Sequence, residues 1–345
     1  MPFELPENPR TARRAAISRW ISLVLVGIMI LLIAYLGYAG YAGSGQLVEP
    51  PDPSTDCRTP ESAFGWRYEA INYNIATDDA LDAFTDRMHC PEQGAPAGDE
   101  LTASDGTRIA GWYIPAVVGS PSTGATVVLA HGYGDNKSDM LEWAEILHRD
   151  YNVVLFDFRN HGQSADGATT LGVRERQDLR AVLDWLEATK APTGVAVLGL
   201  SLGGSAAVNV AAGDPRVDAL VLDSTHATIA NAVQARLERQ GYPLSLPAAW
   251  AILMGGLLRT GEDVSSVDPV QAMERYGDRP VLLLFGGRDD RVGRDAPADL
   301  QAAAEEGGSD ARLQTCDDAG HAQLVETCPD EYRAWVLAFL AHSLP

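Results

Sequence analysis

The segment Gly199-Leu200-Ser201-Leu202-Gly203 carries the most specific chemical motif in the chain, directly after VAVLGL and before LGGSAAVNVAA. A G-x-S-x-G turn between a strand and a helix presents the serine hydroxyl as a nucleophile at a sharp corner. The amide groups that open the following helix favour negative charge at the same point. Phosphate binding is the alternative use of such a turn, but neither G-x-G-x-x-G nor G-x-x-x-x-G-K-[ST] is present. We therefore predict covalent catalysis through Ser201.

A serine nucleophile needs a base that takes its proton and a third group that orients the base. His321 follows Gly320 in a loop near the end of the chain, and Asp289 follows an apolar run. The chain thus contains the three residue types that transfer an acyl group to water.

Short apolar segments rich in β-branched residues alternate with helical patterns along the region that contains these residues. The expected strands are Thr126–Ala130, Asn152–Phe158, Gly194–Leu200, Ala219–Asp223, Pro280–Phe285 and Ala311–Thr315. The expected helices between and after them are Ser138–Arg149, Arg174–Ala188, Leu202–Ala212 and Tyr332–His342. Gly98–Ser104 and Thr107–Pro115 flank a hairpin dipeptide and are expected to open the series as antiparallel strands. This alternation predicts a mostly parallel sheet covered on both faces.

Two further segments complete a resemblance to the α/β-hydrolase family. His131-Gly132-Tyr133-Gly134 ends one strand, and residues 156–164 (FDFRNHGQS) resemble the family's D-x-R-G-x-G-x-S turn. Asn160 stands where the family usually has glycine, and we interpret the neighbouring His161 as structural. The resemblance covers about residues 97–345 and implies an α/β-hydrolase fold, with a mostly parallel eight-stranded sheet, helices on both faces and a small helical cap.

The resemblance also assigns the catalytic roles. Residues 285–292 (FGGRDDRV) resemble the family's G-x-x-D-x-x-V segment, whose register selects Asp289 as the acid. Asp290 and Asp223 are the rival acids, because Asp290 is adjacent and some relatives place the acid where Asp223 lies. His321 is then the base, since serine, aspartate and histidine follow the family's chain order. His226 follows Asp223 at a strand end and is the other histidine of interest.

An oxyanion hole is the remaining expectation from the resemblance. It assigns the two donors to the backbone N–H groups of Tyr133 and Leu202. One such donor lowers the barrier by roughly 3 kcal/mol.

Residues 226–270 interrupt the alternation of strands and helices between two expected strands. They contain a predicted helix over Ile229–Arg239 and a second over Ala248–Leu258, which is apolar throughout. One interpretation is a helix packed in the body of the domain. The other is a cap whose apolar face lines an acyl pocket. The candidate substrate contacts in this cap are Trp250, Leu253, Met254 and Leu257.

The N-terminal region has the pattern of a membrane helix. Trp20–Val48 contains no charged residue, and its apolar centre is close to the roughly 20 residues that span a bilayer. Four arginines precede this segment, namely Arg10, Arg13, Arg14 and Arg19, while acidic residues follow it. The positive-inside rule then places the N-terminus in the cytoplasm and the remainder outside. A cleaved signal peptide is the alternative, but its apolar stretch usually has about 7–15 residues.

These patterns divide the chain into four parts. Residues 1–19 are expected to form a cytoplasmic tail, 20–42 a transmembrane signal anchor, 43–96 a linker and extension, and 97–345 the hydrolase domain. A helix near Thr77–Met88 is expected within the extension. An extracytoplasmic location favours disulfides between the four cysteines. Pairing nearest neighbours gives Cys57–Cys90 and Cys316–Cys328.

Composition limits the partners. The formal net charge of −21 repels phosphate backbones, which argues against nucleic-acid binding. No cofactor or metal is implied, because no Cys or His cluster has zinc spacing. The expected substrate is a small acyl-containing or lipid-like ester or thioester. The alternatives are a serine peptidase of the prolyl-oligopeptidase type and an inactive membrane-bound binding module. The sequence does not determine the oligomeric state.

Overall fold

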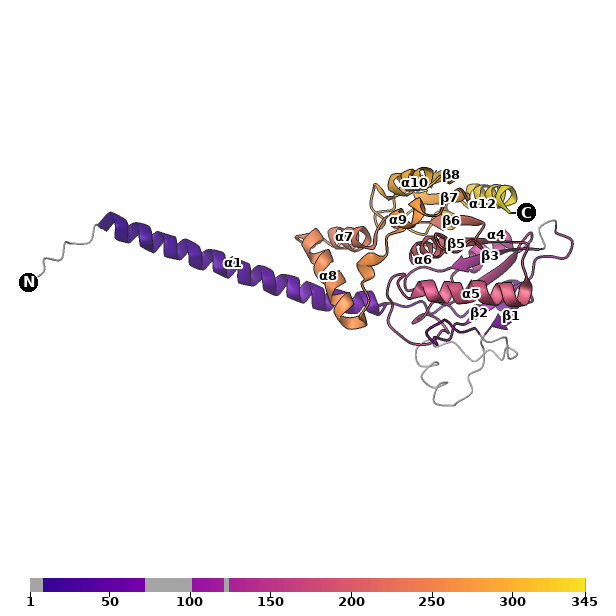
Figure 1. Cartoon of the computed structure of the whole chain (residues 1–345), viewed down its shortest axis with the longest axis horizontal. Helices are drawn as coiled ribbons and strands as arrows, with labels where there is room; N and C mark the ends of the chain where they lie inside the picture. The colour runs from indigo at the N-terminus through magenta and orange to yellow at the C-terminus, as the bar shows by residue number, and fades with distance from the viewer. Residues whose placement is uncertain (1–8, 72–100, 121–123, 345) are drawn as a thin grey trace, which may run out of the picture.

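The computed structural model describes residues 9–71, 101–120 and 124–344 (Figure 1). The expected helix near Thr77–Met88 lies outside these residues. The described part contains an eight-stranded sheet with the order β1-β2-β4-β3-β5-β6-β7-β8. The strands are β1 (Glu69–Ile71), β2 (Gly111–Ile114), β3 (Ala125–Ala130), β4 (Asn152–Phe156), β5 (Gly194–Leu200), β6 (Ala219–Asp223), β7 (Val281–Gly286) and β8 (Ala311–Cys316).

The sheet is parallel from β4 to β8 and antiparallel at the β1–β2 edge. Its central strands are buried along their whole length because helices cover both faces. The prediction of a mostly parallel eight-stranded α/β-hydrolase sheet is therefore confirmed.

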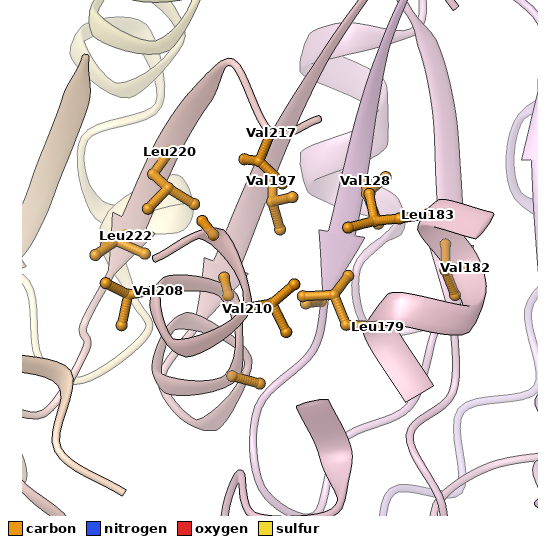
Figure 2. Close-up of a cluster of buried hydrophobic side chains, with 14 of the residues drawn as sticks. Val128, Leu179, Val182, Leu183, Val197, Val208, Val210, Val217, Leu220 and Leu222 are labelled. Atoms are coloured by element: carbon orange, nitrogen blue, oxygen red, sulfur yellow. The ribbon is translucent and has the colours of Figure 1, made fainter. Parts of the chain in front are cut away.

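Side chains that alternate along each strand divide the core into two clusters. Val128 and Val197 face one cluster, which is completed by α5 (Glu175–Lys190), α6 (Leu202–Ala211), α9 (Pro269–Glu274) and α10 (Ala296–Glu306). Figure 2 shows the valines and leucines of this cluster between the strands and helices. Leu129 and Leu198 face the opposite cluster, together with α4 (Leu141–Leu147), α11 (Leu324–Thr327) and α12 (Pro329–Ser343).

The prediction that the segments on either side of Asp105-Gly106 form two paired antiparallel strands is wrong. The Asp105-Gly106 turn forms, but the described residues around it make only one isolated bridge, Thr102–Arg108. The following strand, β2, instead pairs with β1 and β4, where its four residues are all buried. Burial between two neighbouring strands of the sheet outweighs the local hairpin signal. Gly98 to Glu100 lie outside the described residues.

The helix α1 (Pro9–Val48) runs without a break from the arginine-rich segment to the hydrolase body and projects away from it (Figure 1). It is the one helix in the described ranges that is long and apolar enough to cross a membrane. The expected linker over residues 43–56 is therefore helical up to Val48. The small residues of this stretch do not end the helix, because they pack closely against a helix of the cap.

The insertion between β6 and β7 forms the cap. It contains α7 (Ile229–Arg239), α8 (Ser245–Thr260), the 3-10 helix η1 (Val264–Ser266) and α9. Leu47 of α1 belongs to the same buried cluster as Ile252 and Leu253 of α8 and Leu237 of α7. The end of the N-terminal helix and the cap thus share one small core.

Candidate active site

Ser201 lies at the sharp turn between β5 and α6, as the G-x-S-x-G motif predicts. Its backbone has φ +52° and ψ −107°, a conformation that costs energy for a residue with a side chain. The Ser201 N–H donates to Asp223 O of the neighbouring strand at 2.8 Å, which helps to hold the strained turn. This conformation presents the hydroxyl beyond the strand end, where another group can reach it.

The glycines of the motif are required by close backbone approach. A Cβ atom on Gly203 would lie 2.0 Å from Ala130 O, and one on Gly199 would lie 2.5 Å from Gly204 Cα. Neither contact can be relieved by a side-chain movement, because the neighbouring atoms belong to the backbone. The turn is therefore specified by its two flanking glycines as well as by the serine.

His321 and Asp289 complete a hydrogen-bonded chain with Ser201. His321 Nε2 lies 3.0 Å from Ser201 Oγ, and His321 Nδ1 lies 2.8 Å from Asp289 Oδ2. The other carboxylate oxygen of Asp289 accepts from the N–H of Arg291 at 2.9 Å. Burial alone would raise the pKa of Asp289, but the hydrogen bond and charge of His321 outweigh it and lower that pKa. An ionised Asp289 fixes the imidazole with Nδ1 protonated and leaves Nε2 to accept from the serine.

The rival residues lie outside this chain. The Asp290 side chain is two-thirds exposed and faces Arg239. Asp223 is buried and accepts hydrogen bonds from Ser224 Oγ and the Tyr332 hydroxyl, both at 3.0 Å. The ring of His226 lies beside that of His321, with centroids 5.7 Å apart, and within the described residues it forms no hydrogen bond with Ser201. The geometry thus brings together the three residues that the sequence selects.

The expected oxyanion-hole donors lie at the ends of β3 and β5. Leu202 opens α6, and Tyr133 lies in the glycine-rich turn after β3. Within the described part of the chain, no hydrogen bond uses the N–H of either residue. The turn is held by His161, whose Nε2 accepts from the Gly134 N–H at 3.2 Å while its Nδ1 lies 2.9 Å from Arg159 O. The structural interpretation of His161 agrees with these contacts.

His131 supports the same turn from inside. It is completely buried, its Nε2 accepts from the Phe158 N–H at 2.9 Å, and its Nδ1 lies 2.7 Å from Gly132 O. This arrangement needs a neutral ring, because a proton on Nε2 would face the Phe158 N–H. Burial, followed by the charge of His161, lowers the pKa of His131 to about 3 from its usual 6.5.

This geometry predicts a pH-dependent contribution to stability. The folded pKa lies below the unfolded value, so the stabilisation is present above pH 6.5 and is lost as the pH falls toward 3. His131→Gln should be less stable than the wild type at neutral pH. That difference should shrink by about 1.4 kcal/mol per pH unit as the pH falls from about 6 to 4. Urea unfolding of both proteins at several pH values measures the difference in their free energies of unfolding. A difference that stays constant with pH would contradict the conclusion that His131 is neutral in the folded protein.

The cap residues occupy two different environments. Leu253 is buried in the cluster shared with α1, and Leu257 is partly buried. Trp250 and Met254 are about half exposed on the outer surface of α8. The assignment of all four residues to an acyl pocket stays a prediction. Because α8 is apolar on almost every side, its sequence pattern does not identify which face is buried.

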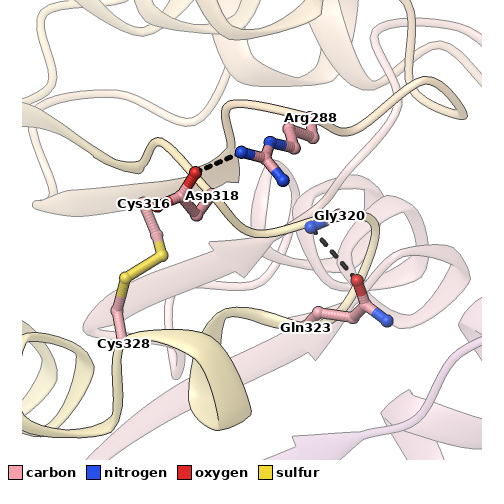
Figure 3. Close-up of a disulfide and its surroundings, with 6 residues drawn as sticks. All are labelled: Arg288, Cys316, Asp318, Gly320, Gln323 and Cys328. Atoms are coloured by element: carbon pink, nitrogen blue, oxygen red, sulfur yellow. Dashed lines mark hydrogen bonds and ion pairs between the residues drawn. A yellow bond between two sulfur atoms is a disulfide. The ribbon is translucent and has the colours of Figure 1, made fainter.

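The predicted disulfide between Cys316 and Cys328 is confirmed, with Cα atoms 6.3 Å apart. Cys316 ends β8, Cys328 precedes α12, and the loop between them carries His321 (Figure 3). Two hydrogen bonds hold the same loop. The Gly320 N–H donates to Gln323 Oε1 at 3.2 Å, and the Ala322 N–H donates to Ser224 Oγ at 3.0 Å. The other expected pair, Cys57–Cys90, includes a residue outside the described part.

We expect the disulfide to contribute to the position of the base as well as to the stability of the fold. Changing Cys316→Ser together with Cys328→Ser should lower the free energy of unfolding by about 2–4 kcal/mol. Turnover measured where the protein remains folded should fall about ten- to a hundredfold, because a base displaced by a fraction of an ångström loses its alignment. Kinetics at low temperature and unfolding curves measure the two effects. Unchanged turnover in the folded variant would contradict the expectation.

A mostly parallel eight-stranded sheet with a serine–histidine–aspartate chain at its strand ends is characteristic of the α/β hydrolases. The model of the alpha/beta hydrolase family matches residues 127–335, which is more than half of the chain. The chain belongs to this family.

Curated relatives are similar over most of the chain. One is the uncharacterized protein YfhR of Escherichia coli K12, 26% identical over 294 residues, which cover 80% of this chain and 88% of that protein. An uncharacterized protein of Mycobacterium tuberculosis H37Rv is 32% identical over 216 residues, covering 61% of this chain and 69% of the relative. These likenesses support the family without adding a substrate.

Solved structures show the same fold. The Pyrococcus furiosus esterase Pf2001 superimposes with a TM-score of 0.64 at 23% identity, covering 86% of this chain and all of that chain. A hydrolase from Pseudomonas aeruginosa PA01 gives a TM-score of 0.53 at 24% identity. The superposition covers 70% of this chain and 97% of that hydrolase. At these identities the likeness establishes the fold alone.

Proposed function

We propose that the chain is a serine hydrolase that cleaves an ester or thioester through an acyl-enzyme on Ser201. The observation that carries the proposal is the continuous chain from Ser201 Oγ to His321 and Asp289, with distances of 3.0 and 2.8 Å. Both distances lie in the range expected for a nucleophile, its base and the group that orients the base. The solved structure that shares the fold is named an esterase, so esters are the first substrates to test.

The proposed reaction follows from this geometry. His321 Nε2 accepts the Ser201 proton as Oγ attacks the acyl carbon, and Asp289 stabilises the imidazolium that forms. Among the described residues neither the Tyr133 N–H nor the Leu202 N–H has a hydrogen-bond acceptor, so both can donate to the developing oxyanion. Collapse expels the alcohol or thiol, which takes the proton from His321. Water then attacks the acyl-enzyme by the same steps and regenerates Ser201.

A labelling experiment tests the proposal. The full chain in detergent should react with a fluorophosphonate and hydrolyse a series of nitrophenyl esters of increasing chain length. Thioester and dipeptide substrates in the same assay separate the proposed activity from the peptidase alternative. Absence of both labelling and turnover would favour the inactive binding module.

We also propose that α1 is a retained signal anchor that places the hydrolase domain outside the cytoplasm. The charge-free segment of α1 is flanked by arginines on its N-terminal side alone. Retention is favoured by the contacts of Tyr35 and Gly40 with the cap, because cleavage near Ala42 would remove both residues.

The proposed topology predicts the behaviour of fusions after Pro345. A reporter that is active only outside the cytoplasm should be active, and one that needs the cytoplasm should be silent. The physical reason is the cost of moving the N-terminal arginines across the membrane. Fusions to a chain with those four arginines changed to glutamate serve as the control. The reverse reporter pattern in the unchanged chain would contradict the topology.

A further inference from the structure

The outer face of α8 carries a row of exposed apolar side chains. Leu246, Trp250, Met254 and Leu258 follow one another at four-residue spacing and are 50%, 52%, 55% and 81% exposed. This spacing places them on one side of the helix. No charged residue occurs from Ser245 to Leu258. A continuous apolar face of this kind marks an interaction surface.

The turn before α8 extends this surface. Tyr242 and Leu244, between α7 and α8, are about half exposed. Together with the four residues of α8 they form one surface, which we call the cap face. Its position relative to α1 identifies what covers it.

The helices α1 and α8 pack against each other, and α8 crosses α1 at an angle (Figure 1). The Tyr35 hydroxyl donates to Pro243 O at 2.5 Å, before α8 begins. Further along, a Cβ atom on Gly40 would lie 2.8 Å from Ala251 O, so the two backbones are in close contact. Near the end of α8, Arg259 Nε donates to Ser44 Oγ at 2.9 Å. The first turn of α8 is therefore its end nearest the apolar centre of α1.

This contact fixes the depth of the cap face. The charge-free run of α1 begins at Trp20, and the roughly 20 residues that cross a bilayer extend from there to about Ala39. Tyr35 then lies close to the outer boundary of the hydrocarbon, where aromatic residues are enriched. Pro243 lies at the same level because it accepts the hydrogen bond of Tyr35.

We propose that the cap face docks on the lipid bilayer that α1 spans, with the turn before α8 at the boundary between acyl chains and headgroups. The inference rests on the proposed anchoring by α1. Lipid is favoured over a protein partner because the cap face continues the exposed surface of α1, where Tyr38 and Tyr41 are each nearly three-quarters exposed. Arg259, at the far end, stacks over the Tyr41 ring at the level expected for lipid phosphates. The docked cap holds the hydrolase domain against the membrane.

Lipid crosslinking tests this proposal. The full chain is reconstituted in phosphatidylcholine nanodiscs that contain a phospholipid with a diazirine near the carbonyl end of one acyl chain. After illumination, peptide mapping should find lipid adducts on residues 242–258 as well as on α1. Val118, which is almost fully exposed on the loop after β2, is the internal control and should carry none.

A variant sharpens the test. Leu246→Gln with Leu258→Gln should abolish the adducts on 242–258 and leave those on α1 unchanged, while retained fluorophosphonate labelling shows that the domain is folded. Adducts on α1 alone in the wild type would overturn docking and leave the anchor in place. Absence of adducts from both helices would overturn the anchor and the docking together, without bearing on the labelling of Ser201. In a separate sample, a photoreactive amino acid at position 254 that crosslinks to a second copy would show that a second copy covers the face and would also overturn the proposal.

Discussion

Replacing Ser201 by alanine should lower turnover of an ester substrate by about three orders of magnitude or more and abolish fluorophosphonate labelling. The reason is that the serine, histidine and aspartate act as one unit. Without Oγ, His321 has no proton to accept and no acyl-enzyme can form. Steady-state kinetics with one nitrophenyl ester measures the loss.

A matched serine variant separates this effect from damage to the fold. Ser266→Ala changes an exposed serine of the cap whose hydroxyl donates to the carbonyl of Asp263 at 2.6 Å. It should retain labelling and turnover close to the wild type. Unfolding curves should show that the Ser201→Ala protein is folded. Turnover retained by folded Ser201→Ala would refute the assignment of the nucleophile.

Much of the candidate active site could be predicted because short sequence motifs around each residue indicate its position. The G-x-S-x-G turn needs glycines at Gly199 and Gly203 whatever the rest of the fold does, since a Cβ atom at either would meet backbone. Asp289 and His321 could be placed because both follow a strand in the order that the family uses. Their contact in space still depended on the order of β5, β6, β7 and β8, which the resemblance implied and the sheet shows.

The parts that could not be predicted depend on contacts between segments distant in the chain. Residues 43–48 have the composition of a linker, but they continue the helix and pack against Ile252 and other residues of the cap. The exposed position of Trp250 could not be predicted from the sequence for a related reason. A helix that packs against both a membrane helix and a domain has no single polar face, so its periodicity does not reveal its orientation.

A buried ion pair beside the site was also missed. Lys137 and Asp157 are both almost completely buried, and the Lys137 ammonium donates to Asp157 Oδ2. The same carboxylate accepts from the N–H of Lys137 and from the N–H of Gln163, each at 2.7 Å. It therefore joins the turn after β3, which carries Tyr133, to the turn after β4. The sequence gives no signal for this pair, because a lysine after a turn most often lies in solvent.

Lys137→Met should therefore lower the free energy of unfolding by about 3–5 kcal/mol. The variant leaves the Asp157 carboxylate buried with two backbone donors and no cation, and most of the cost is that of the unpaired charge. Burial lowers the pKa of Lys137, and the charge and hydrogen bond of Asp157 oppose that shift. Urea unfolding of the detergent-solubilised protein measures the change.

Two further variants identify the cause of that loss. Lys190 is the chain's other lysine and pairs with the largely exposed Glu69, so Lys190→Met should cost no more than about 1 kcal/mol. Adding Asp157→Asn to Lys137→Met removes the unpaired charge and should restore at least half of the lost stability, because the amide oxygen can still accept from a backbone N–H. If the double variant is instead as unstable as Lys137→Met or worse, packing of the lysine stem rather than charge pairing holds the two turns together.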